Sequence, residues 1–382
     1  MKGHVRKRGN RWYFALWIPN PITGKKEQKW FSSWKTEPEA KKAMARKILE
    51  IDQGSYIEPA RIPLKDYLIR WYKDYVELNC AATTRQGYKS ILKNHLIPEL
   101  GHIKLGKLKP IQIQSYYTQK SKKGRKDGRK GGLSHRSILH HHRVLYEALE
   151  QAVKWQLLSA NPAKSTTPPK PARAQFNVLT TKEEIYTLLD TVDRKGLYDP
   201  VYFAICTGLR RGELFALRWA DVDMKNNIIS IQQTLILLDG NILEFKDGAK
   251  NDGSRRTVAV TDSIINGLKR RKIEQEQHKA YYGPLYKDHD LIFSNKDGSP
   301  INIGSFSKTF GRTVKKADIP YVRFHDLRHS HATLLLQQGE HPKIVSERLG
   351  HSSIGITMDT YSHVLPNMQK EAAQKLDDFL TR

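Results

Sequence analysis

The C-terminal half of this chain contains the stretch Thr207-Gly208-Leu209-Arg210-Arg211-Gly212-Glu213-Leu214, which sets two arginines between two glycines. The pattern is typical of a helix start, where backbone N–H groups already favour an anion. Arginines are common on protein surfaces, so this stretch alone does not define a functional site. It gains meaning from three segments that follow it in the C-terminal half.

The second segment is His325-Asp326-Leu327-Arg328-His329. A helix over this segment places His325 and Arg328, three residues apart, on one face, while leucines mark its opposite side. An arginine beside a histidine can hold a phosphate next to a proton donor. The segment therefore predicts a phosphate-binding helix.

A zinc site is the alternative for this helix, because His325 and His329 have the four-residue spacing of a zinc pair. The glutamate of a His-Glu-x-x-His motif is replaced here by Asp326-Leu327, and Arg328 would set a positive charge against the ion. No third ligand is evident in the sequence. We therefore expect no metal and no other cofactor.

The last two segments are Leu349-Gly350-His351-Ser352-Ser353-Ile354 and Asp359-Thr360-Tyr361-Ser362-His363. Taken alone, a tyrosine such as Tyr361 is usually core or surface filler. Here it follows His351 by ten residues and lies downstream of two arginine segments.

Together the four segments resemble the tyrosine recombinase, or phage integrase, family. In that family an arginine follows Thr-Gly-Leu, a His-x-x-Arg motif opens a later helix, a histidine or tryptophan follows Leu-Gly, and the nucleophilic tyrosine comes about ten residues later. The positions that match, in the family's order, are Arg210, His325, Arg328, His351 and Tyr361.

The resemblance also implies a catalytic lysine on a β-hairpin between the two arginine segments. The stretch Lys250-Asn251-Asp252-Gly253-Ser254-Arg255-Arg256-Thr257 fits, although Asn251 replaces a common threonine. Lys250 is our choice, and Lys246 is the fallback. His331 is a further departure, because the family often has an aromatic residue there; we expect it to change packing and to have no new role.

Phosphoryl chemistry explains why these residue types recur. A phenol attacking a phosphodiester passes through a phosphorane with extra negative charge, which preorganised cations stabilise. Arg210 and Arg328 suit that task, because the guanidinium fork matches phosphate geometry and stays charged. Tyr361 is the expected nucleophile.

Proton transfer is assigned to the remaining groups. A phenol has a pKa near 10, so the nucleophile must lose its proton as it attacks, and His325 is the expected base. Lys250 would protonate the departing 5′ oxygen, and His351 would hydrogen-bond the scissile phosphate. Because a phosphotyrosine conserves the bond energy, rejoining needs neither ATP nor metal.

Charge is distributed unevenly along the 382 residues. The net charge is +26, and residues 1–177 carry +23 of it, with 36 Lys and Arg against 13 Asp and Glu. The remainder is nearly balanced, with 29 against 26. This asymmetry predicts phosphate-binding modules joined to a domain with a different task.

Targeting and redox signals are weak. No apolar stretch is long enough for a membrane span and no secretory signal is evident, so we expect a cytoplasmic, nucleoid-associated protein without a membrane partner. The two cysteines, Cys80 and Cys206, have no metal-ligand or redox spacing and are expected to be core thiols.

Residues 1–55 predict a small β-sheet closed by one helix, because aromatic and polar residues alternate before a helical pattern begins near Glu37. We expect most of Trp12, Trp17, Trp30 and Trp34 to form its core. By resemblance this is an arm-type DNA-binding domain. Its expected DNA-contacting residues are Arg6, Lys7, Arg8, Lys25 and Lys26.

Residues 61–162 predict a helical domain that resembles the family's core-DNA-binding domain. Thr83 and Ser134 are expected to cap two of its helices, and the cluster His140 to His142 is expected on a helix surface near phosphates. A mobile basic loop should separate the last two helices. Its candidate DNA-contacting residues are Lys122, Lys123, Arg125, Lys126, Arg129 and Lys130.

A proline-rich connector is predicted at 163–178, followed by the catalytic domain at 179–382. The alternating run from Ile228 to Leu238 and the later Thr257–Val260 predict a small antiparallel sheet among helices. The fold class is thus multidomain and mainly α with small antiparallel sheets, with a helical core-binding domain and an α-rich catalytic domain.

The expected partner is double-stranded DNA with core and arm attachment sites, bound by a homotetramer, with an excisionase and DNA-bending proteins as further candidates. An apolar stripe after Pro366 could dock on a neighbouring protomer or on its own domain. Two other functions remain open: a catalytically silent DNA-binding regulator, and a type IB topoisomerase-like strand relaxase.

Overall fold

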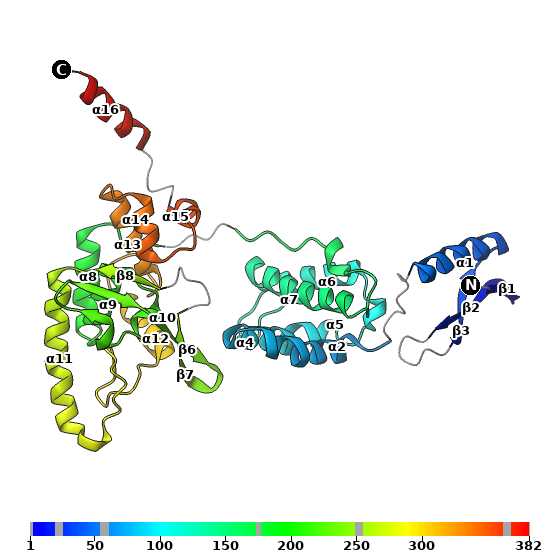
Figure 1. The fold of residues 1–382 in the computed structure, drawn as a ribbon, viewed down its shortest axis with the longest axis horizontal. Helices are drawn as coiled ribbons and strands as arrows, with labels where there is room; N and C mark the ends of the chain where they lie inside the picture. Colours follow the sequence, from blue (N-terminus) through cyan, green and yellow to red (C-terminus); the bar gives the residue numbers. More distant parts are fainter. Residues whose placement is uncertain are drawn as a thin grey trace. The chain divides into compact units, whose positions relative to one another are not determined.

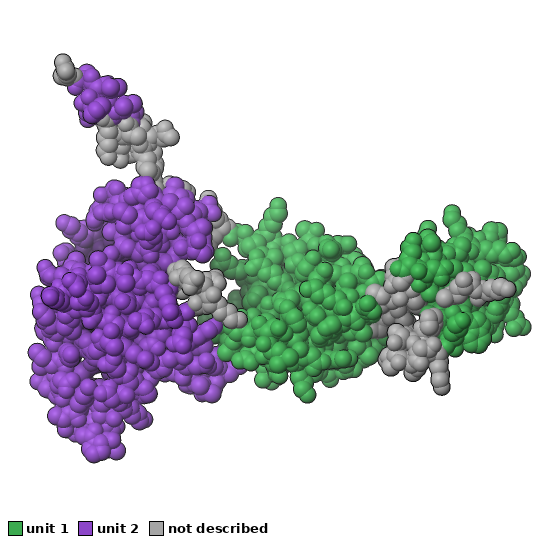
Figure 2. Space-filling view, in the orientation of Figure 1, with its two compact units in different colours: residues 1–173 green, residues 174–382 purple. Residues whose placement is uncertain are grey.

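The computed structural model describes residues 3–19, 26–53, 61–172, 177–248, 255–361 and 368–381. It divides the chain into two compact units, residues 1–173 and 174–382, which Figure 2 shows in different colours. The boundary falls inside the connector expected at 163–178. The predicted fold class is confirmed, because helices dominate and every paired sheet is small and antiparallel (Figure 1). Within the described ranges, no helix is long and apolar enough to cross a membrane.

The N-terminal part holds a three-stranded antiparallel sheet, β1 (Gly3–Arg8), β2 (Arg11–Pro19) and β3 (Lys26–Trp34), followed by helix α1 (Glu37–Asp52). Phe14, Leu16 and Ile18 alternate along β2 and pack toward α1. The expected tryptophan core is therefore wrong in part. Trp17 is 50% exposed and Trp30 is 40% exposed. Trp17 lies between two buried residues of β2, so its side chain points to the opposite face of the sheet.

The helical part of the first unit runs from Leu64 to Ser165. Its helices are α2 (Leu64–Trp71), α3 (Glu77–Asn79), α4 (Ala82–Ile91), α5 (Ile97–Leu100), α6 (Pro110–Lys122) and α7 (His135–Lys154), with π-helical turns at Tyr72–Val76 and Leu92–Leu96. A short 3₁₀ turn, Pro162–Ser165, follows them. Tyr67, Trp71 and Leu145 are fully buried in the shared core.

Two local predictions for this part differ in outcome. Ser134 caps α7 as expected, because its hydroxyl accepts a hydrogen bond from the Ser137 N–H at 3.2 Å. Thr83 does not cap α4, which begins at Ala82 after Ala81. Ala81 has the extended backbone of an N-cap residue, so the helix starts two residues earlier than a cap at Thr83 would predict.

The histidine cluster on α7 does not lie wholly on the surface. His141 is 3% exposed and its Nδ1 lies 2.8 Å from the hydroxyl of Tyr116, while His142 pairs with Tyr117 at 2.7 Å. Burial lowers the pKa of His141 to about 3. The expectation of phosphate-facing histidines is therefore wrong for His141, because α6 supplies buried phenols opposite it.

The second unit contains a sheet of order β4-β5-β8 and a separate hairpin β6-β7. The strands are β4 (Val222–Asp223), β5 (Ile228–Ile231), β6 (Gln233–Leu238), β7 (Ile242–Asp247) and β8 (Arg256–Ala259). The alternating run from Ile228 to Leu238 is thus two strands in two sheets. The chain changes sheet at Gln233, whose buried side chain donates to the carbonyl of Ala216 at 2.7 Å.

Several helices of the second unit pack around this sheet and supply most of the core. The described helices of the unit are α8 (Lys182–Asp193), α9 (Tyr198–Thr207), α10 (Arg211–Leu214), α11 (Asp262–Tyr282), α12 (Ile303–Val314), α13 (Asp326–Gln337), α14 (Pro342–Leu349), α15 (Ile354–Tyr361) and α16 (Met368–Leu380). Helix α13 packs against α9 and α14. Its buried Leu327 and Ala332 hold the helix in place, so the charged residues between them acquire fixed positions.

Candidate active site

Arg210 stands where α9 ends and α10 begins. Gly208 ends α9 in the left-handed region at φ 67°, and a Cβ there would come within 2.5 Å of the His331 ring, so glycine is required. The Arg210 guanidinium donates to Glu213 Oε1 at 2.7 Å and to the carbonyl of Gly350 at 3.0 Å. Its side chain remains 41% exposed. Two hydrogen bonds therefore fix the Arg210 guanidinium, while part of its side chain remains accessible to a ligand.

Arg328 is buried on α13, with 4% of its surface exposed. Its two terminal nitrogens donate to the carbonyls of Gly208 at 2.8 Å and Leu349 at 2.6 Å. A guanidinium has five N–H donors, so these two bonds leave others for a ligand. Burial and the charge of Arg210 lower the pKa of Arg328. A bound anion would offset this unfavourable effect on the charged form of Arg328.

Glu213 and Arg256 form a buried ion pair that sequence reasoning missed. Arg256 donates to both carboxylate oxygens of Glu213, at 3.2 and 2.8 Å, and its Nε donates to the carbonyl of Arg348 at 2.8 Å. Both side chains are 8% exposed. Because Glu213 also holds Arg210, this pair joins β8 to the turn that carries Arg210. The available signal was the Arg-x-x-Glu spacing, since a glutamate three residues into a helix often bonds back to the first turn.

Replacing Glu213 by glutamine is expected to destabilise the second unit. Burial alone would raise the pKa of Glu213, but the hydrogen bonds and charge of Arg256 and then the charge of Arg210 lower it to about 2. A depressed carboxyl pKa stabilises the folded state above the unfolded value of about 4.3, and this contribution disappears as pH falls toward 2. Urea unfolding should show a loss of about 3 kcal/mol at pH 7 that shrinks below pH 4. An equal loss of stability at pH 7 and below pH 4 would contradict the ion-pair explanation.

Tyr361 ends α15 and is 1% exposed, in a small cluster with Leu336, Val345 and Leu349. Its hydroxyl lies 2.6 Å from Nδ1 of His329 on α13. Burial raises the pKa of Tyr361 to about 12, although the charge of Arg328 opposes the rise. The phenol therefore keeps its proton at neutral pH.

His325 directly precedes α13 and is an exposed residue. The ring centroids of His325 and His329 are 5.4 Å apart, with the planes at 87°. Partial burial and the charge of Arg328 lower the pKa of His325. Within the described ranges, no group of three or more His, Cys, Asp or Glu side chains is arranged to hold a metal ion.

His351 follows Gly350, which ends α14 at φ 66°. Its Nδ1 lies 2.8 Å from the hydroxyl of Thr357 on α15. Burial, together with the charges of Arg328 and Arg210, lowers the pKa of His351 to about 4. The ring is therefore neutral near pH 7, and its Nε2 can form a hydrogen bond with a phosphate.

The five predicted residues that the structure describes thus converge. Arg210 and Arg328 bond the carbonyls of Gly350 and Leu349, the two residues before His351, while His325 and Tyr361 flank His329. The sixth candidate, Lys250, lies outside the described residues. The fallback Lys246 lies on β7, opposite Thr234, with its side chain exposed.

The predicted DNA-contacting residues are exposed wherever the structure describes them; Lys25 lies outside the described residues. The exposed residues are Arg6, Lys7, Arg8, Lys26, Lys122, Lys123, Arg125, Lys126, Arg129 and Lys130. Arg8 stacks over Trp30 at 4.8 Å, which places a cation on an exposed aromatic ring of the sheet. In the basic loop, Asp127 pairs with Arg125 and lies 3.9 Å from Arg129.

His331, the other departure from the family pattern, is buried at 5% exposure. Its Nδ1 lies 2.8 Å from the carbonyl of Ile205, and burial lowers its pKa to about 4. It fills the space left by Gly208, so its contacts are those of a packing residue.

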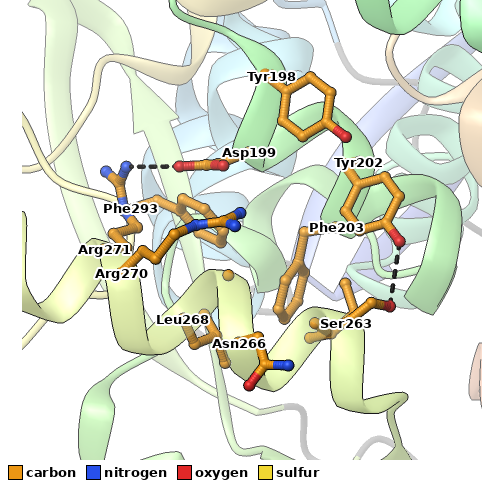
Figure 3. A pocket seen from close by; sticks show the side chains of 12 residues that line it. Tyr198, Asp199, Tyr202, Phe203, Ser263, Asn266, Leu268, Arg270, Arg271 and Phe293 are labelled. Atoms are coloured by element: carbon orange, nitrogen blue, oxygen red, sulfur yellow. Dashed lines mark hydrogen bonds and ion pairs between the residues drawn. The ribbon is translucent and has the colours of Figure 1, made fainter.

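A cavity of about 320 Å³ lies between α9 and α11 (Figure 3). Tyr198 and Tyr202 stack along it at 5.6 Å, and Arg271 pairs with Asp199 at 3.5 Å. The hydroxyls of Tyr202 and Ser263 lie 3.2 Å apart. None of the candidate catalytic residues is among those lining it, so this cavity is separate from the arginine site.

Family models match three parts of the chain. The phage integrase family model matches residues 179–368, the N-terminal SAM-like domain of phage integrases matches 64–121, and the arm DNA-binding domain matches 4–51. A tyrosine recombinase XerC-like protein of Caldanaerobacter subterraneus is 28% identical over 99% of this chain and 98% of its own. The ICEBs1 integrase of Bacillus subtilis is 30% identical over 82% of each chain.

Solved structures share the fold at low sequence identity. The integrase of the Tn1549 transposon, in complex with a circular intermediate DNA, has a TM-score of 0.68 at 19% identity, covering 82% of this chain and 99% of that one. A lambda integrase dimer bound to a core site has a TM-score of 0.57 at 18% identity and covers 93% of each. A lambda integrase tetramer bound to a Holliday junction has a TM-score of 0.55 at 18% identity, covering 91% of this chain and 95% of that one.

Proposed function

This chain belongs to the phage integrase family and is a site-specific tyrosine recombinase, and we propose that it cuts DNA by forming a covalent bond between Tyr361 and a 3′ phosphate. One observation carries the assignment of residues. Arg210 and Arg328 come from distant parts of the sequence and bond the carbonyls of neighbouring residues beside His351. Two fixed guanidinium groups at one turn are suited to a phosphodiester.

Each residue then has one task. Arg210 and Arg328 stabilise the negative charge of the phosphorane, and His351 donates a hydrogen bond to a non-bridging oxygen. Tyr361 attacks phosphorus, and His325 serves as the general base. The phosphotyrosine conserves the energy of the broken phosphodiester bond. Lys250 supplies the proton for the leaving 5′ oxygen. A 5′ hydroxyl from the partner strand reverses these steps to rejoin DNA.

The biological reaction follows from the same chemistry. We propose that the protein integrates or excises a mobile element or prophage in a bacterial cytoplasm, in association with the nucleoid, because several relatives are named as integrases of such elements. An excisionase and DNA-bending proteins are proposed partners that would choose between the two directions.

The decisive test is a covalent adduct formed without metal. DNA duplexes enriched from a random-sequence pool by binding to the protein would be nicked at successive positions and incubated with it in EDTA. Denaturing electrophoresis should show a slow protein–DNA species, and mass spectrometry should place the nucleotide on the peptide that contains Tyr361. Binding to the selected duplex without any adduct would favour a silent regulator. Relaxation of supercoils without strand exchange between paired sites would favour a topoisomerase.

The basic loop between α6 and α7 is proposed to contact the DNA backbone. Replacing Lys122, Lys126 and Lys130 by glutamine should weaken binding and reduce the slope of log affinity against log salt by about 0.9 for each phosphate that is no longer neutralised. The measurement is fluorescence anisotropy at several salt concentrations.

The matched control for the loop removes the same charge from exposed lysines of the second unit. Its substitutions are Lys182→Gln, Lys195→Gln and Lys225→Gln. An equal change of slope in both triple variants would show that net charge alone matters, and would contradict binding of DNA by the loop.

Helix α16 is proposed to dock on a neighbouring protomer within a tetramer on DNA. Leu376, Phe379 and Leu380 are 59%, 85% and 70% exposed, which is unusual for large apolar side chains on one helix. Deleting residues 367–382 should leave binding of one protomer intact and abolish cooperative filling of a two-protomer site in gel-shift titrations. Wild-type cooperativity after this deletion would contradict docking in trans.

A further inference from the structure

The hydroxyl of the proposed nucleophile is already in contact with a histidine outside the predicted set. Tyr361 Oη and His329 Nδ1 are 2.6 Å apart, and the two ring centroids are 5.7 Å apart at 53°. His329 lies one turn after His325 on α13, directly beside Arg328. The Oη atom of Tyr361, which is the proposed attacking atom, is therefore within hydrogen-bond distance of His329.

The direction of this hydrogen bond follows from the two protonation states. Burial and the charge of His325 lower the pKa of His329 to about 4, so its ring is neutral at pH 7. Burial raises the pKa of Tyr361 to about 12, so the phenol is protonated. A neutral imidazole has one N–H and one accepting nitrogen, and the phenolic O–H needs an acceptor. The reaction proposed below uses the tautomer in which Nδ1 of His329 accepts from the phenol and the histidine's own proton resides on Nε2.

The charged groups near His329 are two arginines and one aspartate. Asp326 and Arg328 lie on α13 and Arg323 precedes that helix, while the rings of His325 and His351 also lie nearby. Asp326 is occupied by a bidentate contact with Arg323. The remaining positive charge disfavours a second proton on His329 in the free protein. A phosphodiester bound at Arg328 offsets that charge, so DNA itself increases the proton affinity of His329.

We propose that His329 is a catalytic residue, the first acceptor of the Tyr361 proton during strand cleavage; this rests on the proposed function. As the O–H bond of Tyr361 breaks, the proton moves to Nδ1 and the oxygen lone pair forms the bond to phosphorus. The bond from phosphorus to the 5′ oxygen breaks, and that oxygen takes a proton from the general acid. Rejoining returns the His329 proton to the tyrosine. His325, the general base of the proposed function, then becomes the second acceptor of that proton.

The test is His329→Asn, because the asparagine Oδ1 can accept the same hydrogen bond but does not bind a proton at neutral pH. The probe is the selected duplex, with a 5′-bridging sulfur at the cleavage position found by adduct mapping. A sulfur leaving group needs no acid, so the rate reports on the tyrosine side of the reaction. Single-turnover cleavage should fall about 100-fold at pH 7. It should then rise tenfold for each pH unit, as hydroxide replaces the missing base.

His325→Asn is the matched control, since it makes the same change four residues earlier, at the residue that precedes α13. It should slow cleavage without creating the tenfold rise for each pH unit. Wild-type cleavage by His329→Asn would overturn the proposal, and so would a loss that is equal at every pH, because that is the mark of positioning alone. If the wild-type protein forms no adduct, the proposed function fails instead.

A second measurement needs no substitution at His329. In nitrogen-15 spectra of the histidine-labelled protein without DNA, Tyr361→Phe should change the chemical shift of one accepting ring nitrogen, because its hydrogen bond from the phenol is removed. Unchanged signals from all 15 histidines would overturn the proposal.

Discussion

Phenylalanine in place of Tyr361 is expected to abolish the covalent protein–DNA adduct while leaving DNA affinity unchanged. The substitution removes the attacking oxygen and preserves the ring, which is buried at 1% exposure among apolar neighbours. The fold should tolerate it, since losing the hydrogen bond between Tyr361 and His329 costs about 1–3 kcal/mol. Denaturing electrophoresis measures the adduct, and gel-shift titration on the same selected duplex measures binding.

Tyr202→Phe is the matched control for this result. Tyr202 also lies in the second unit, and its hydroxyl contacts Ser263 at the cavity between α9 and α11. It should form adduct at the wild-type rate. Any adduct on Tyr361→Phe would show that another residue attacks phosphorus, whereas loss of adduct in both variants would indicate damage to the unit as a whole.

Lysine in place of Arg328 is expected to lower cleavage by about three orders of magnitude, near the upper end of what one preorganised donor contributes. Lysine keeps the charge but cannot bond the carbonyls of Gly208 and Leu349 and also present a fork to phosphate. The loss should appear in the single-turnover rate at saturating protein. DNA affinity should change far less, because many other cations bind the backbone.

Arg348→Lys separates this effect from general structural damage. Arg348 also donates to two backbone carbonyls, those of Ala259 at 3.0 Å and Cys206 at 3.3 Å. It should lower thermal stability and keep most of the cleavage rate. If Arg328→Lys and Arg348→Lys reduced cleavage by the same factor, the role of Arg328 at the phosphate would be contradicted.

Much of the site could be predicted because its residues sit in short contiguous motifs. Thr-Gly-Leu-Arg fixes its own local geometry, since Gly208 must end α9 with a positive φ and Arg210 must follow. His325 and Arg328 share a helix face by spacing alone. Matches of this kind need only local backbone structure, so a single sequence was sufficient.

Contacts between distant segments could not be predicted in this way. The Glu213–Arg256 pair joins residues 43 positions apart, and each is ordinary in its own segment. His329 was seen only as half of a disfavoured zinc pair. Its contact with Tyr361 depends on how α15 returns to α13, 32 residues later. The same holds for His141, whose burial depends on the phenols of α6.

The sequence by itself determined the helical fold class, and its resemblance to the family supplied the residues of the candidate phosphate site and the proposed nucleophile, Tyr361. It could do so because periodicity and motif spacing act over a few residues. The tertiary structure decided which carboxylate holds the arginines, which histidine touches Tyr361 and which tryptophans face solvent. Those outcomes depend on packing and desolvation between elements far apart in the chain. The free energy of burying or pairing each side chain is therefore set by residues that a local sequence pattern does not contain.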